Sequence, residues 1–240
     1  MLYTTEGIVL HNVRYADKKL ISKIYTKDFG LLSLNVNVGK SPRSGVRAAV
    51  IQPLSQVELV LSLKENKEVH QLVEAKCYYV YQNIPVDFLK LSIAQFMNEV
   101  LYKCIKEQSR NEDLFQLITR AYQWLDVAEQ GYSDLHVFFL FELTKHLGFY
   151  PTNNRSTQDK YFDTREGKFH AMSRSFPLGF DETCSELFAR LFDHDLGNQN
   201  HFLRQERQVL LDCLMAYYKM QVPGLPEFKS YRVFQETLYE

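Results

Sequence analysis

The amino-acid sequence predicts an α+β protein in which a small closed β-barrel is followed by a helical bundle with a small inserted hairpin. Two observations predict this class. Residues 1–80 contain about five short strand-like segments and no helix longer than a turn, whereas from residue 86 onward apolar residues recur at three- and four-residue steps. A small sheet hides its hydrogen-bonding edges best by closing on itself, so we expect the strands to form a barrel.

Five segments account for the predicted barrel. Residues 5–13 and 20–26 are rich in β-formers and flank a polar turn, and residues 31–38 alternate so that Leu32, Leu34, Val36 and Val38 share one face. A long strand over residues 48–63, bent or bulged at Pro53, and a last strand over 67–79 complete the set. The count favours a five-stranded barrel of the oligonucleotide-binding (OB) type, with an SH3-like barrel as the alternative.

One basic loop, residues 39–47, interrupts these strands. Gly39, Pro42 and Gly45 would keep the loop out of its flanking strands, and it carries three cations and no acidic residue. Such a loop suits a polyanion such as a nucleic-acid backbone, although short charge runs are often only solvated. The candidate DNA-binding cations are those of the loop and of the neighbouring elements: Lys40, Arg43, Arg47, Lys18, Lys19 and Lys23.

The net charge of −1 hides an asymmetry along the chain. Residues 1–80 carry 11 Lys and Arg against 7 Asp and Glu, a net charge of +4, and residues 81–240 carry the balancing −5. A contact with a polyanion is therefore expected to begin in the N-terminal barrel, residues 1–80.

Residues 81–240 are expected to form the helical domain. Helical periodicity covers residues 88–104 and 114–125, the second behind a capping Asn111. Ser133 and Asp134 are expected to cap a third helix over residues 135–147, which is apolar almost all round and should lie at the centre of the bundle. The remaining expected parts are a hairpin that pairs 161–163 with 168–170, helices over 181–192 and 199–219, and an extended tail over 222–240.

The cysteines and the termini point to a reducing, cytoplasmic setting. The four cysteines form no Cys-x-x-Cys pair, and each lies in apolar sequence and is expected to be a small buried hydrophobe. No segment approaches the roughly 20 apolar residues that span a bilayer, and the N-terminus has no signal-peptide pattern.

The order of these parts resembles the RecO family of bacterial recombination mediators. The resemblance covers most of the chain and is carried by short segments that are individually weak but occur in the family's order. These segments are Gly7-Ile8-Val9-Leu10, Ile24-Tyr25-Thr26 with Gly30, Gly39-Lys40, Gln52-Pro53-Leu54, His146-Leu147-Gly148-Phe149-Tyr150-Pro151, and Gly224-Leu225-Pro226-Glu227-Phe228-Lys229-Ser230-Tyr231-Arg232.

The resemblance implies a non-enzymatic role in DNA repair and homologous recombination. Family members bind single- and double-stranded DNA, anneal complementary strands and, with the RecR partner, help to load the recombinase on strands coated by single-stranded-DNA-binding protein. The tail of that coating protein docks on the helical domain of some members, and here Phe138 and Phe139 stand where a basic residue would help. A bacterial cytoplasmic, nucleoid-associated location is implied as well.

One departure from the family concerns a metal. Many members carry a four-cysteine zinc site just after the proline that ends the third helix. Residues 152–174 of this chain contain no cysteine, and their strong ligand types are only Asp159, Asp163, Glu166 and His170. We therefore expect no metal and no cofactor, and a degenerate zinc-finger-like insertion at about 152–175 that is held by packing around Phe162 and Phe169.

Two other functional classes stay open. Asp193-His194-Asp195 with His201 has the residue types of a metal site, as a metal-dependent nuclease would need, but these residues lie in a polar turn. The sequence contains no Gly-rich phosphate loop, nucleophile elbow or His-Glu-x-x-His motif, so we expect no enzyme. A partner-dependent adaptor whose barrel binds a peptide is the other alternative.

Aromatic side chains of the barrel are further candidates. Tyr15, Tyr25 and Phe29 could stack on bases if they are exposed, or could pack in the core or in turns if they are not.

Overall fold

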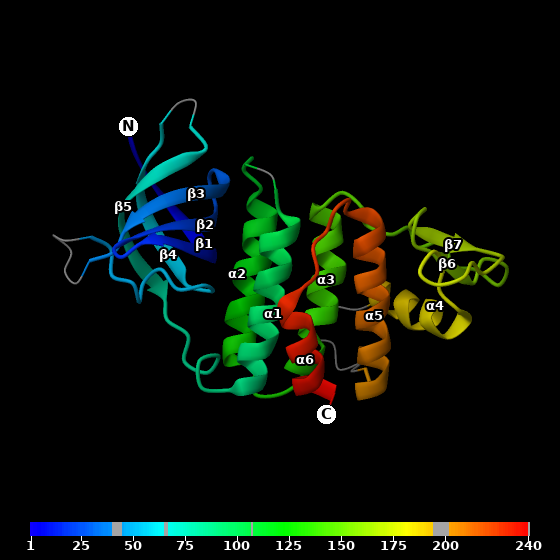
Figure 1. Ribbon diagram of the computed structural model, residues 1–240. Helices are drawn as coiled ribbons and strands as arrows, with labels where there is room; N and C mark the ends of the chain where they lie inside the picture. Colours follow the sequence, from blue (N-terminus) through cyan, green and yellow to red (C-terminus); the bar gives the residue numbers. More distant parts are fainter. Residues whose placement is uncertain (40–44, 65–66, 107, 194–201, 240) are drawn as a thin grey trace. The chain divides into compact units, whose positions relative to one another are not determined.

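The computed structural model describes residues 1–39, 45–64, 67–106, 108–193 and 202–239 (Figure 1). It divides into two compact units, Met1–Val127 and Ala128–Glu240, and each unit is described by itself. The expected division into a barrel of residues 1–80 and a helical domain of residues 81–240 stays a prediction.

Five strands close a barrel in the first unit. Their order around the barrel is β1-β2-β3-β5-β4, and every neighbouring pair is antiparallel except β3 with β5. This closed barrel confirms the predicted five-stranded OB-like fold. The strands are β1 (Leu2–Ala16), β2 (Lys19–Thr26), β3 (Gly30–Asn37), β4 (Gln56–Ser62) and β5 (Val69–Tyr79).

The alternation of β3 fills the barrel as predicted. Leu32, Leu34 and Val36 are buried in the barrel core, and Val38 packs against it. The expected long strand over residues 48–63 is wrong, because β4 begins only at Gln56. Residues 47–55 instead form successive turns, in which the N–H groups of Val50, Ile51 and Ser55 donate to the carbonyls three residues earlier. Pro53 lacks an N–H for a strand ladder, and Leu54 has a φ of +78°, which a strand does not allow.

Two helices complete the first unit, α1 (Phe88–Cys104) and α2 (Glu112–Val127). The predicted cap of α2 is confirmed, because the Asn111 side chain accepts the N–H of Leu114 at 3.0 Å. Asn98 of α1 donates to the carbonyl of Leu10 in β1 at 2.7 Å. This bond satisfies a buried amide and fastens α1 to the barrel wall.

The second unit is built around α3 (Leu135–His146). Its residues 135–141 are all buried, as the all-round apolar sequence predicted. The expected Ser133–Asp134 cap is wrong, because Asp134 makes no side-chain cap bond at the start of α3. Its carboxylate instead accepts the N–H of Phe202 at 2.9 Å and lies 2.8 Å from Arg207, so it holds the start of α5 (Arg204–Gln221).

The insertion and the C-terminal segment complete the second unit. The predicted hairpin is confirmed as β6 (Tyr161–Asp163) and β7 (Lys168–His170), and it is followed by α4 (Glu182–Ala189). An extended tail was expected after α5, but the chain forms α6 (Lys229–Tyr239). This helix buries Phe234, whose ring packs edge-on against His136 at a centroid distance of 4.8 Å. Within the described residues, no helix is both long and apolar enough to span a bilayer.

Candidate nucleic-acid interface

The outer face of β1, β2 and β3 carries cations because of the alternation of β2. Leu20, Ser22 and Ile24 are buried, so Lys19 and Lys23, which alternate with them along the strand, point outward. Lys19 is exposed, whereas Lys23 is half-buried and its ammonium donates to the Ser33 hydroxyl at 2.7 Å. The strand thus presents two positive groups on one side of the barrel.

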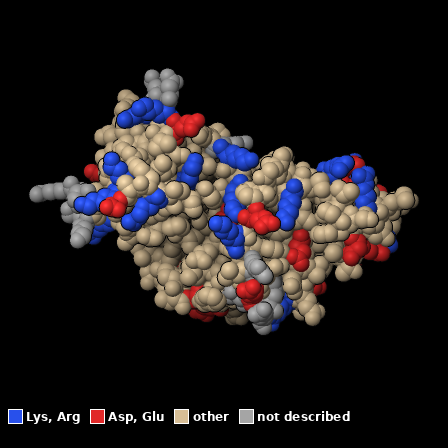
Figure 2. All heavy atoms as spheres, viewed as in Figure 1, with Lys and Arg blue, Asp and Glu red and all other residues tan. Residues whose placement is uncertain are grey.

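The last part of β1 and the turn that follows it add further charge on this side of the barrel. Lys18 and Arg14 are exposed, and Asp17 is the acidic residue between them. Figure 2 shows Lys and Arg side chains spread over the barrel strands, with fewer Asp and Glu among them. On the β4 side, Glu58 is ion-paired with Lys76 at 2.7 Å. The β1–β2 side carries four cations with no carboxylate partner among the described residues, hereafter the basic face (Arg14, Lys18, Lys19 and Lys23).

The flanks of the basic loop lie beside this face. The N–H of Val38 donates to the Lys18 carbonyl at 2.8 Å, and the N–H of Gly39 donates to the Val46 carbonyl at 3.0 Å. The exposed Arg47 directly follows Val46. The structure therefore places Lys18, Lys19 and Lys23 beside one flank of the loop, at Val38, and Arg47 on its other flank, after Val46. Lys40 and Arg43 lie outside the described residues.

Tyr15 is the one exposed side chain among the three candidate aromatic residues. It is 53% exposed and its hydroxyl donates to the Asn35 side chain at 2.8 Å. Tyr25 is buried, and Phe29 packs edge-on against Tyr3 at a centroid distance of 5.5 Å, so both have packing roles. Of these three, Tyr15 is the one that is exposed enough to stack on a base.

Two amide side chains on this face were missed by the sequence reasoning. Asn35 of β3 donates to the Gln71 side chain of β5 at 3.1 Å. Together with Tyr15 they form a hydrogen-bonded polar line across the outside of the barrel. The alternation of β3 could have identified Asn35 as an outward-facing residue. Its hydrogen-bond partners could not be predicted in this way, because they depend on which strands pair.

The acidic and histidine side chains of the insertion form an ion-pair network. Ligand atoms of Asp163, Glu166 and His170 lie within 4.8 Å of one another, a spacing that could hold a metal ion. Arg174 already lies 3.0 Å from the Asp163 carboxylate, and Lys168 lies 3.1 Å from Glu166. The Lys168 ammonium is the main reason that the pKa of Glu166 lies below its ordinary value. The charges are thus balanced by side chains, and the expected absence of zinc stays a prediction.

The remaining candidates are the alternative metal site, two phenylalanines of α3 and the cysteines. His194, Asp195 and His201 of the alternative metal site lie outside the described residues. Phe138 and Phe139 are buried, so neither is available to a docking peptide. The expectation that all four cysteines are buried is wrong, because Cys104 and Cys213 are buried, Cys184 is half-buried and Cys77 is exposed.

Comparisons with known proteins cover almost the whole chain. Residues 1–81 match the family described as "Recombination protein O N terminal", and residues 85–232 match "Recombination protein O C terminal". The chain is 33% identical over 243 residues to the DNA repair protein RecO of Flavobacterium psychrophilum, covering 99% of both chains. It is 30% identical over 239 residues to the DNA repair protein RecO of Phocaeicola vulgatus, covering 98% of this chain and 99% of that one.

Proposed function

The chain belongs to the RecO family of DNA repair proteins, and from this premise we propose that it is a recombination mediator that binds single- and double-stranded DNA through its barrel. The observation that supports DNA contact is the basic face, where Lys18 and Lys19 lie beside the flanks of the basic loop. Flexible lysines on an outer strand face suit phosphates, which they can neutralise without reading the sequence.

We propose strand annealing as the activity of this face. Contacts to the phosphate backbone leave the base edges free, so a strand held in this way can still pair with its complement. The neutralised charge also lowers the repulsion between two DNA strands. No covalent step is required, and we therefore propose that the protein acts without catalysis.

The proposed protein partners are RecR and the tail of the single-stranded-DNA-binding protein, with recombinase loading as the outcome. We propose that the tail docks on the second unit. Because Phe138 and Phe139 are buried, the contact would have to use other residues, and the exposed Lys145 near the end of α3 is a candidate cation.

Fluorescence anisotropy of labelled oligonucleotides tests DNA contact through the loop. Replacement of Arg43 and Arg47 with alanine should weaken binding to all sequences alike and flatten the salt dependence, by about 0.7 in log–log slope for each lost single-strand phosphate contact. Lys27→Ala is the control, because Lys27 is paired with Glu6 at 3.7 Å in the turn before β3, whereas the basic loop follows β3. Unchanged binding by the double variant would remove the loop from the interface.

The same oligonucleotides test the absence of catalysis. Incubation of the protein with labelled DNA and Mg²⁺ should leave the DNA intact. Cleavage that survives further purification of the protein would contradict the mediator proposal and favour a nuclease.

A further inference from the structure

Among the described residues, one edge of β5 has no strand partner along residues 73–77. The parallel pairing of β5 with β3 involves only Val69–Gln71 of β5, whereas β4 pairs with the opposite edge of β5 along almost its whole length. Among the described residues, no backbone hydrogen bond joins residues 73–77 to the facing segment 45–50. The N–H and C=O groups of an uncovered edge are a template for another extended chain.

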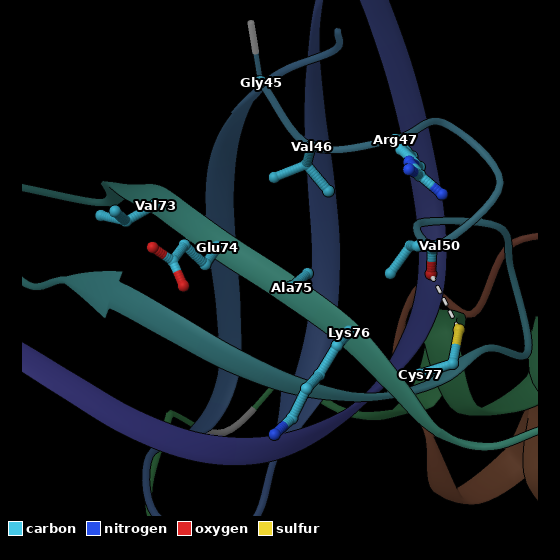
Figure 3. A pocket seen from close by; sticks show the side chains of 9 residues that line it. All are labelled: Gly45, Val46, Arg47, Val50, Val73, Glu74, Ala75, Lys76 and Cys77. Carbon is cyan, nitrogen blue, oxygen red and sulfur yellow. Dashed lines mark hydrogen bonds between the residues drawn. The ribbon is translucent and has the colours of Figure 1, made fainter. Parts of the chain in front are cut away.

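A pocket lies between this edge and residues 45–50 (Figure 3). Its volume is about 410 Å³, which is in the range of ligand pockets. Figure 3 shows Val46 and Val50 pointing toward β5, with Ala75 on the facing strand. These three side chains also pack with the barrel core, so the pocket has an apolar floor of fixed shape.

The rim of the pocket is charged and incompletely paired. The Lys76 ammonium forms an ion pair with the Glu58 carboxylate at 2.7 Å. The exposed Arg47, in contrast, has no carboxylate partner among the described residues. The exposed Glu74 likewise has no cation partner there. Arg47 is complementary to an acidic side chain, whereas Glu74 repels any anion at the opposite wall, so a single carboxylate is favoured on the Arg47 side alone.

We propose that an extended acidic segment of a partner protein binds here as an added strand along residues 73–77 of β5. It seats an apolar side chain against Val46, Val50 and Ala75 and places a carboxylate against Arg47. Polypeptide backbone matches the alternating donors and acceptors of a strand edge, and pockets beside the edge select alternate side chains. A nucleobase fits less well, because the residues that line the pocket include no aromatic ring. The inference goes beyond DNA contact and does not depend on it.

Site-resolved labelling tests the binding mode. The probe is a pool of octapeptides in which valine, isoleucine or alanine alternates with threonine, and one threonine is replaced by aspartate. At millimolar concentration the pool should slow amide hydrogen exchange at residues 73–77 and slow alkylation of the exposed Cys77, which lines the pocket. The half-buried Cys184 of the second unit is the internal reference. No protection at residues 73–77 would overturn the proposal.

A matched pair of variants tests the location. Val73 and Val69 lie on the same strand and are 42% and 38% exposed, but only Val73 lines the pocket. Val73→Asp should weaken peptide binding about tenfold or more, since it places a carboxylate beside the acidic peptide, and Val69→Asp should not. Equal effects of the two substitutions, with unchanged thermal melting, would place the peptide elsewhere.

A single-stranded oligonucleotide tests whether the pocket binds DNA instead of a peptide. Anisotropy with a single-stranded oligonucleotide should show equal DNA affinity for Val73→Asp and Val69→Asp. The opposite result would be that the oligonucleotide protects Cys77 from alkylation and that Val73→Asp, but not Val69→Asp, weakens DNA binding. In that case the pocket holds a base and the peptide proposal fails, although DNA contact by the barrel stands.

Discussion

The Asp126 carboxylate accepts the backbone N–H of Asn83 at 2.8 Å, and the Asn83 side-chain amide donates to the Asp126 carbonyl at 2.8 Å. The N–H groups of Gln82 and Ile84 donate to the same carboxylate. Burial alone would raise the pKa of Asp126, but the backbone donors outweigh it and the pKa is lowered. The end of α2 is thereby fastened to the segment that joins β5 to α1.

We expect Asp126→Asn to destabilise the first unit by about 2–4 kcal/mol, because a neutral amide cannot accept three backbone N–H groups as a buried carboxylate does. Urea unfolding followed by the fluorescence of Trp124, on the same helix, measures this loss. Asp113→Asn, an exposed substitution in the first turn of α2, should change stability little. Equal midpoints for the two variants would contradict the role given to Asp126.

The second unit should lose stability in mild acid through His136. Burial, reinforced by the charge of Arg207, lowers the pKa of this histidine to about 3. The neutral ring therefore stabilises the fold fully above the unfolded pKa of about 6.5, and this contribution is lost as the pH falls from there toward 3. The unfolding free energy should fall by at most about 1.4 kcal/mol per pH unit across that window.

Urea unfolding at a series of pH values, followed by hydrogen exchange in α3, checks this expectation. His136→Gln should flatten the dependence between pH 6.5 and 4.5, whereas His70→Gln on β5 should leave it unchanged. A slope that persists in His136→Gln would assign the effect to another group.

The inserted hairpin should be held by aromatic packing without a metal. Phe162 is fully buried, and its ring centroid lies 5.2 Å from that of Phe169 and 4.3 Å from that of Phe188. Phe162→Ala should cost about 3–5 kcal/mol, while a strong chelator should leave the melting temperature of the wild type unchanged. Phe176→Ala, at a 62% exposed position, is the control. A drop in melting temperature with the chelator would indicate a bound metal.

Tyr15 should distinguish single-stranded from double-stranded DNA. Tyr15→Ala should weaken single-strand binding by about 1–3 kcal/mol through the loss of a stacked base, and should affect a duplex less because its bases are already stacked. Tyr15→Phe keeps the ring but loses the hydrogen bond to Asn35, so it should retain most of the affinity. Equal losses on both kinds of DNA would assign Tyr15 to a general surface role.

Local periodicity predicted most of the fold. The three- and four-residue spacing predicted residues 88–104, which are the bounds of α1, and the alternation of β3 identified its core-facing residues. Two failures have tertiary causes. The helix α6 is stabilised by Phe234 against His136, nearly 100 residues earlier, and Asp134 binds Phe202 and Arg207 instead of capping α3.

The sequence likewise predicted one part of the candidate site and missed another. The lysines of the basic face could be found from charge and from the alternation of β2. The line formed by Tyr15, Asn35 and Gln71 depends on the register of three strands, and the uncovered edge of β5 depends on where β3 stops pairing. Neither follows from the sequence of one strand alone.

The most direct measurement is anisotropy of a labelled single-stranded oligonucleotide at two salt concentrations with two triple variants. One replaces Lys18, Lys19 and Lys23 with alanine, and the other replaces Lys64, Lys67 and Lys76, which removes the same charge from outside the basic face. We expect the first variant to bind every sequence more weakly, with a log–log salt slope flattened by about 2, and the second to keep the wild-type slope. Equal slopes for the two variants would contradict DNA binding by the basic face.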